Sequence, residues 1–180
     1  MIWRFLNNRL PKFQSLVPVY AVIVFMVYTW TIYAFIRFLP YWLNFLNVSE
    51  ILAIFSYAML SDCLESLGIL FLLSVSCVIL PAGFLRNTFV VRGSVIATCL
   101  LGAGIVYMAT IPKTSPPPLI SYILWSLAVL AAAIFLAFAA AKIRFVVSAM
   151  EWLSNSMIIF LYIYIPITAL SLLNVIFRNL

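Results

Sequence analysis

Five apolar runs, each long enough to cross a lipid bilayer, constrain this chain more than any other feature of its sequence. An α-helix rises 1.5 Å per residue, so about 20 apolar residues cover the roughly 30 Å of membrane hydrocarbon. Hydrophobic residues make up 67% of the 180 residues and charged residues 8%, which leaves no stretch for a water-soluble domain. We therefore predict an all-α fold, a polytopic integral membrane helical bundle in which residues 1–180 form a single domain. The predicted spans, bounded mainly by charged residues or proline, are 16–36, 64–80, 94–111, 119–141 and 157–176.

Residues 41–60 are also apolar, but their first half carries Asn44, Asn47 and Glu50. This segment is either a sixth span or a helix at the membrane surface. A sixth span would need a tight turn within 61–66, and it would divide the Lys and Arg residues evenly between the two sides of the membrane. Five spans place most of these residues on one side, as cytoplasmic loops do. We therefore predict an amphipathic or re-entrant helix over 41–60 against the outer leaflet.

The distribution of basic residues also predicts an orientation. With five spans, placing the N-terminus in the cytoplasm puts the larger share of the positive charge inside. The C-terminus then lies on the opposite side, and we expect the membrane to be the plasma membrane of a prokaryote. The predicted inner side holds Arg4, Arg9, Lys12, Arg86, Arg92, Lys142 and Arg144, and the outer side holds Arg37, Lys113 and Arg178.

Three of the four acidic residues, Glu50, Asp62 and Glu65, lie close together in the sequence. An ionised acid in the middle of a bilayer costs about 2.5 to 3.5 kcal/mol, so such residues often mark an ion or proton path. Asp62 and Glu65 are three residues apart, however, and this spacing also fits a capping box at the start of the second span. We favour the cap, and keep a cation or proton site and a contact with a partner protein as alternatives.

Small residues recur every four positions in two of the predicted spans, which lets helix backbones approach closely. We expect tight helix packing there, within this chain in preference to between subunits. The residues are Ser94, Thr98 and Gly102 in the third span and Ala133, Ala137 and Ala141 in the fourth.

The last span contains Pro166, which removes one backbone hydrogen bond and favours a kink. Tyr162 precedes it by one turn, and Asn155 lies two turns further back on the same predicted face. A kinked helix with such a polar face can line a cavity. Proline is common in membrane helices, so an inert kink is the interpretation that we favour.

Arg86 and Arg92 flank a short loop on the predicted inner side. They are candidates for contact with anionic lipid headgroups, each contributing on the order of 1 kcal/mol. The preference of basic residues for the cytoplasmic side explains them equally well.

The residues that are absent or isolated limit the chemistry. The chain has no histidine and four acidic residues, and Cys63, Cys77 and Cys99 are isolated, so we expect no metal, no cofactor and no enzymatic activity. Its net charge of +6 follows the membrane orientation and forms no basic face for nucleic acid.

We therefore expect a non-catalytic membrane protein, a packing or accessory subunit of a membrane complex or a homo-oligomer, in contact with lipids and other membrane subunits. The alternative is a small transporter or channel component that uses the acidic cluster for a proton, a cation or a small solute.

Overall fold

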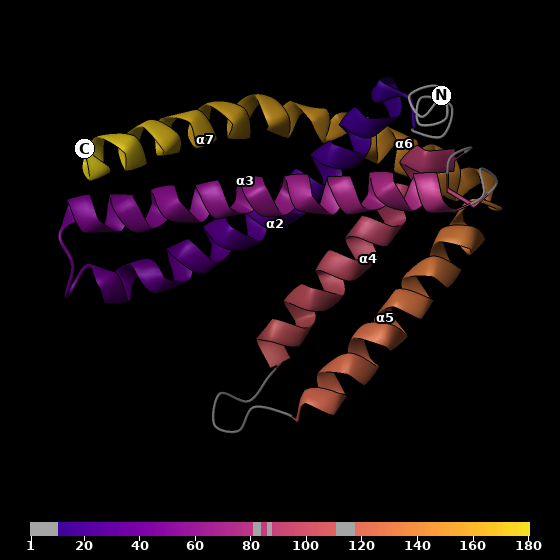
Figure 1. Ribbon diagram of the computed structural model, residues 1–180, viewed down its shortest axis with the longest axis horizontal. Coiled ribbons are helices and arrows are strands. Elements are labelled where there is room, and N and C mark those ends of the chain that lie inside the picture. Colours follow the sequence, from indigo (N-terminus) through magenta and orange to yellow (C-terminus); the bar gives the residue numbers. More distant parts are fainter. Residues whose placement is uncertain (1–10, 81–83, 86–87, 111–117) are drawn as a thin grey trace.

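The computed structural model describes residues 11–80, 84–85, 88–110 and 118–180. Regular structure in these residues is helical, with no β-strand (Figure 1). The helices are α2 (Phe13–Trp42), α3 (Val48–Ile79), α4 (Phe89–Thr110), α5 (Leu119–Ala140), α6 (Arg144–Ser156) and α7 (Ile158–Asn179).

Five helical stretches are long and apolar enough to cross a membrane: α2, α3, α4, α5 and the stretch that joins α6 to α7. Helix α7 alone has 22 residues, about 33 Å of helix, and is the crossing part of the last stretch. The predicted all-α membrane bundle with five spans is confirmed.

The predicted surface helix over residues 41–60 does not exist as a separate element. Helix α2 continues to Trp42, the chain reverses direction within 43–47, and α3 then runs without a break from Val48 to Ile79. The expected boundary at 61–66 is absent because no proline or glycine interrupts the sequence between Val48 and Leu67.

The start of α3 carries its own cap. Asn47 is the N-cap residue, and its backbone N–H donates to Glu50 Oε2 at 2.8 Å. Glu50 stands at the third helical position, where a carboxylate satisfies a free N–H group and favours the positive end of the helix dipole. The capping box therefore lies at Asn47 and Glu50, and Asp62 and Glu65 are interior residues of α3.

A short amphipathic helix is present, but at a different place from the predicted one. Helix α6 has 13 residues, about 20 Å, which is too short to cross the hydrocarbon. It carries Arg144 and Glu151 together with the exposed apolar residues Phe145 and Trp152. This composition fits a helix at the membrane surface. Ser154 anchors α6 to α4, because its hydroxyl lies 3.0 Å from that of Ser94 in a buried hydrogen bond.

Helix α2 is the centre of the bundle and packs against α3, α4, α6 and α7. Its residues are buried almost throughout from Pro18 to Val24. Helix α4 approaches it closely: a Cβ added to Gly93 would lie 3.4 Å from the methyl groups of Val19. Helix α5 lies at the outside against α4, and the two form a hairpin inclined to α3 and α7 (Figure 1).

Some of the small residues that we predicted to pack between helices in α4 and α5 are buried, and others are not. Ala133 and Ala137, on α5, are 0% and 1% exposed and are the only buried residues of that helix. Ser94 is buried against α6, whereas Thr98 is exposed. Gly102 faces α2, where an added Cβ would lie 3.9 Å from Met26 Cε. Ala141 follows the last residue of α5 and is partly buried.

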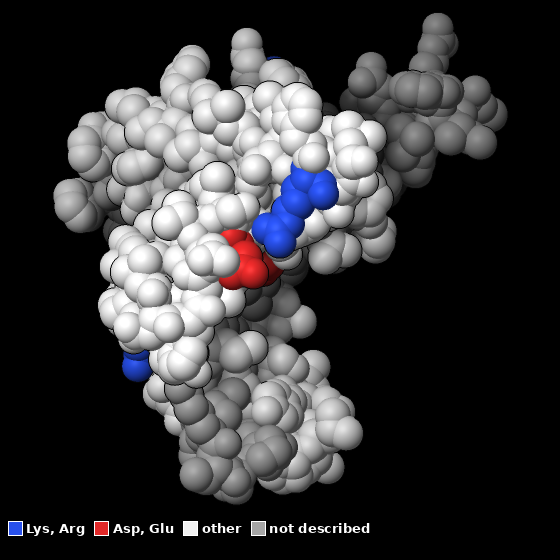
Figure 2. All heavy atoms as spheres, turned by 90° about the vertical axis from the view of Figure 1, so that its left-hand side faces the viewer, with Lys and Arg blue, Asp and Glu red and all other residues white. Residues whose placement is uncertain are grey.

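Charged residues gather at the two ends of the bundle. Lys12, Arg92 and Lys142 lie near the end where α2 and α4 begin, and Arg37 and Arg178 lie near the opposite end. Figure 2 looks onto this opposite end, where basic and acidic side chains meet in one small patch and most of the described surface is uncharged. The acidic residues Asp62 and Glu65 lie between these two ends.

Candidate functional site

Asp62 lies near the middle of α3. It follows Val48 by about 14 residues, roughly 21 Å of helix, and precedes Ile79 by about 17 residues, roughly 26 Å. Helix α3 is longer than the hydrocarbon layer, and charged residues mark both ends of the bundle, so Asp62 lies at mid-depth in the membrane. The side chain is 5% exposed. Asp62 is therefore a buried acid inside the bundle and not a cap at its surface.

One hydrogen bond holds the Asp62 carboxyl group. Thr31, on α2, donates from Oγ1 to Asp62 Oδ1 at 2.8 Å. The second oxygen, Oδ2, is buried and accepts no hydrogen bond within the described part of the chain. A carboxyl oxygen in this position is stabilised by a proton, a bound cation or an ordered water molecule, because an isolated buried charge is costly.

Glu65 lies one turn further along α3 and is exposed. It lines a groove of about 260 Å³ between α2, α3 and α4, together with Trp30, Thr31 and Gly104. Thr31 therefore connects the two acids, because its side chain bonds Asp62 and its residue lines the groove beside Glu65. The three residues form one polar cluster in an apolar region, which we call the mid-depth site.

Glu50 does not belong to the mid-depth site. It lies at the start of α3, about 12 residues and roughly 18 Å from Asp62 along the helix, where it accepts the N–H of Asn47. Of the three acids that are neighbours in the sequence, Asp62 and Glu65 thus lie together in the mid-depth site, and Glu50 lies apart at the start of α3.

A second group of polar contacts joins α7 to α2 and α3. The Tyr28 hydroxyl lies 2.7 Å from Thr168 Oγ1 and donates to the Met59 carbonyl at 3.4 Å. Further along, Asn174 donates through Nδ2 to Ser56 Oγ at 2.8 Å. Sequence analysis missed this polar face of α7. The spacing of Thr168, Ser171 and Asn174 by three residues is the signal that could have indicated it.

The candidate cavity residues of the last span do not share one helix face. Asn155 belongs to α6, because the helix is interrupted at Met157, so it does not share a helix face with Tyr162. Tyr162 is 78% exposed, and Pro166 is also exposed. These positions face outward, while the opposite face of α7 packs inside the bundle.

The structure describes one of the two arginines that are candidates for contact with lipid headgroups. Arg86 lies outside the described residues. Arg92, at the start of α4, donates through Nη1 to the Phe84 carbonyl. Its guanidinium also lies 4.6 Å from the ring centre of Phe138, on α5, in a cation–π contact. Arg92 thus links α4 to α5 at the end of the bundle where α4 begins.

The donor set of the mid-depth site suits a proton or a monovalent cation better than a transition metal. The described residues contain no group of three His, Cys, Asp or Glu side chains that could hold a metal ion. No protein-family model, no curated protein and no solved structure matches the chain. The function of this chain must therefore be inferred from the mid-depth site and from the surfaces around it.

The hydrogen bond between Thr31 and Asp62 leads to a stability prediction. Thr31→Val keeps the size of the side chain and removes the donor, so we expect the free energy of unfolding in mixed detergent to fall by about 1 to 2 kcal/mol. Thr29→Val is the matched control, since Thr29 is exposed on the same helix. It should change the free energy by less than about 0.5 kcal/mol. Equal effects of the two variants would contradict a stabilising contact at Asp62.

Proposed function

We propose that this chain is a non-catalytic integral membrane subunit that binds another membrane protein through the groove at Glu65. The observation that carries the proposal is an exposed carboxylate at mid-depth, on the surface that a membrane would cover. Such a charge costs about 2.5 to 3.5 kcal/mol in hydrocarbon. A partner helix that offers a cation or hydrogen-bond donors to Glu65 removes this cost.

The groove has space for such a helix. A Cβ added to Gly104 would meet no atom within 4 Å, and Met108, further along α4, is largely exposed. Helix α5 buries only two of its residues in the bundle, which leaves most of the α4–α5 hairpin for lipid or protein contacts. Close helix approach at small residues is the usual basis of association in membranes.

The proposed partner is a chain of different sequence and not a second copy of this chain. No described residue of this chain places a Lys or Arg at the depth of Glu65, since Arg37, Arg92 and Arg178 all lie near helix ends. In a symmetric dimer through this groove, two acids would meet and would have to share a proton. A heteromeric partner with a basic or amide side chain satisfies Glu65 without that penalty.

Replacing Glu65 tests the subunit proposal. After extraction in mild detergent, the wild-type protein should have a native mass above that of one chain. Glu65→Leu should shift most of the protein to the mass of one chain, because the polar contact with the partner is lost. Glu151→Leu, which removes an exposed acid on α6 far from the groove, is the matched control and should leave the native mass unchanged. A monodisperse wild-type monomer would overturn the proposal.

The orientation is part of the same proposal. We infer that the end where α2 and α4 begin faces the cytoplasm, supported by the basic residues Lys12, Arg92, Lys142 and Arg144 near it.

A topology test addresses this inference. A reporter that is active only outside the cytoplasm should be active after Leu180 and silent before Met1, because five spans place the two ends on opposite sides. Activity only at the N-terminal fusion would reverse the orientation, and equal activity at both ends would contradict five crossings.

A second candidate function is movement of a proton or a monovalent cation, and a separate observation favours it. Asp62 is buried at mid-depth with Oδ2 free of hydrogen bonds within the described residues, and Thr31 links it to the open groove. An intramembrane acid with an available oxygen is the arrangement on which proton relays and cation sites depend.

Flux measurements separate this candidate from a purely packing role. In liposomes that carry the purified complex, Asp62→Asn should reduce proton or sodium flux at least tenfold, because the amide can neither release a proton nor neutralise a cation. Glu50→Gln is the control outside the site and should retain the wild-type flux. Wild-type flux equal to that of empty vesicles at all pH values tested would exclude the transport candidate and leave the subunit proposal standing.

A further inference from the structure

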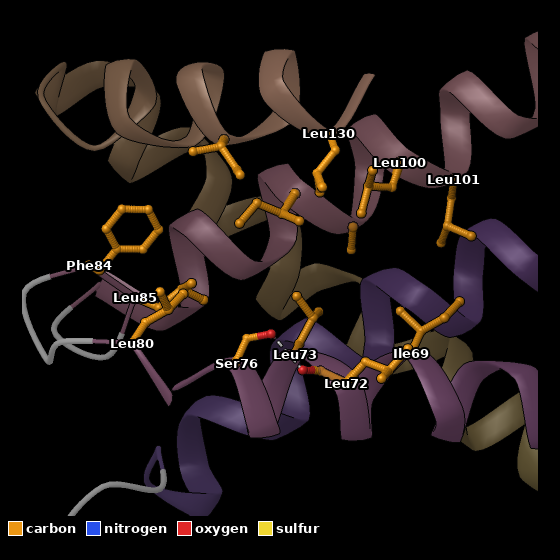
Figure 3. Close-up of a pocket in the computed structure, with 13 residues that line it drawn as sticks. Ile69, Leu72, Leu73, Ser76, Leu80, Phe84, Leu85, Leu100, Leu101 and Leu130 are labelled. Atoms are coloured by element: carbon orange, nitrogen blue, oxygen red, sulfur yellow. Dashed lines mark hydrogen bonds between the residues drawn. The ribbon is translucent and has the colours of Figure 1, made fainter. Parts of the chain in front are cut away.

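An apolar cavity of about 270 Å³ lies between α3, α4 and α5, next to the groove at Glu65, with which it shares Leu100 and Leu101. Figure 3 shows Leu72, Leu73 and Ser76 of α3 facing Leu100 and Leu130 across it. Among the described residues of the lining, Ser76 alone carries a polar side chain, and its hydroxyl donates to the Leu72 carbonyl at 2.8 Å. The described part of the lining therefore offers no free polar side chain to an occupant, and a wholly apolar molecule fits the cavity best.

The length and depth of the cavity match one leaflet of a bilayer. Along α3 it extends from Leu80, at the end of the helix, to Ile69, which is about 11 residues or roughly 16 Å. Half of a hydrocarbon core of about 30 Å is about 15 Å. Along α3 the cavity thus runs from the membrane surface to about one helical turn short of Glu65, a length that suits an extended acyl chain.

The surface end of the cavity is basic. Phe84 lines this end, and its carbonyl accepts a hydrogen bond from Arg92. The ring of Phe84 contacts that of Phe138, over which the Arg92 guanidinium lies. Lys142 and Arg144 follow the end of α5 nearby in the sequence. Each basic residue near a membrane surface attracts anionic lipid by about 1 kcal/mol, a factor of about five in affinity.

From the shape, depth and charge of this region we propose that the cavity holds one acyl chain of an anionic phospholipid, with the headgroup beside Arg92. The apolar lining excludes a polar ligand, and the basic end selects the headgroup. This site contains none of the polar residues of the mid-depth site, and it adjoins the proposed partner groove at Leu100 and Leu101.

Lipid binding to the delipidated full-length protein tests the proposal. The protein in detergent is mixed with phosphatidylglycerol or phosphatidylcholine of the same acyl chains, and bound lipid is measured by native mass analysis. The wild-type protein should bind phosphatidylglycerol about fivefold more tightly. Leu130→Trp fills part of the cavity and should weaken binding of both lipids about tenfold, the effect of losing the burial of roughly two methylene groups.

Three further variants complete the test. Ile123→Trp, at an exposed position of α5 outside the cavity, is the matched control and should bind both lipids as the wild-type protein does. Arg92→Gln should remove most of the preference for phosphatidylglycerol while binding of phosphatidylcholine persists. Leu100→Phe fills the cavity from α4, and an undiminished thermal midpoint without lipid would show that this variant is folded.

Each outcome of these binding measurements either supports or overturns the acyl-chain site. Weakened binding in both cavity-filling variants, with an unchanged control, supports the acyl-chain site. Equal binding by Leu130→Trp and Ile123→Trp overturns it, and so does a wild-type protein that binds no lipid, since a protein partner then covers the cavity. An unchanged lipid preference in Arg92→Gln overturns the position of the headgroup.

Discussion

The absence of water in the membrane interior is the constraint on which the rest of this structure depends. Every backbone N–H and C=O group in the hydrocarbon must find a partner within the chain, and the five long helices provide those partners. Burial of apolar surface drives little association between such helices, because lipid is as apolar as their side chains. Close approach and polar contacts therefore decide how the helices pack. Helix α2 is central because it combines both, with α4 against it at Gly93 and hydroxyl groups directed at α3 and α7.

At the centre of the bundle, polar side chains of one helix form hydrogen bonds with polar side chains of another. Tyr28 bonds Thr168, Ser56 accepts from Asn174, and Thr31 donates to Asp62. Most of these groups are neutral and have partners, so they hold the helices together with little penalty. The acids at mid-depth differ, because one has an oxygen without a hydrogen bond and the other lies in an open groove. This contrast separates the mid-depth site from the polar contacts that serve packing.

The subunit and transport proposals share this site but depend on different atoms. Partner binding depends on the exposed carboxylate of Glu65, and transport depends on the buried Oδ2 of Asp62. Thr31 bonds Asp62 and lines the same groove as Glu65, so a partner in the groove would also alter the surroundings of Asp62. The apolar cavity further along α3 has no charged side chain among the described residues that line it, and it fits a lipid chain. A polar region and an apolar region thus follow each other along α3.

The sequence alone determined the fold class and the number of spans, because the length and apolarity of a run are sufficient to place a helix across a bilayer. It did not determine where Asp62 lies. The spacing of Asp62 and Glu65 fits a helix cap, and only the uninterrupted α3, capped instead by Asn47 and Glu50, places these acids at mid-depth. Likewise, the interruption at Met157 decided that Asn155 and Tyr162 belong to different helices. The physical reason is that apolarity is a property of each segment, whereas depth and facing direction depend on where a helix begins and on which neighbours it meets.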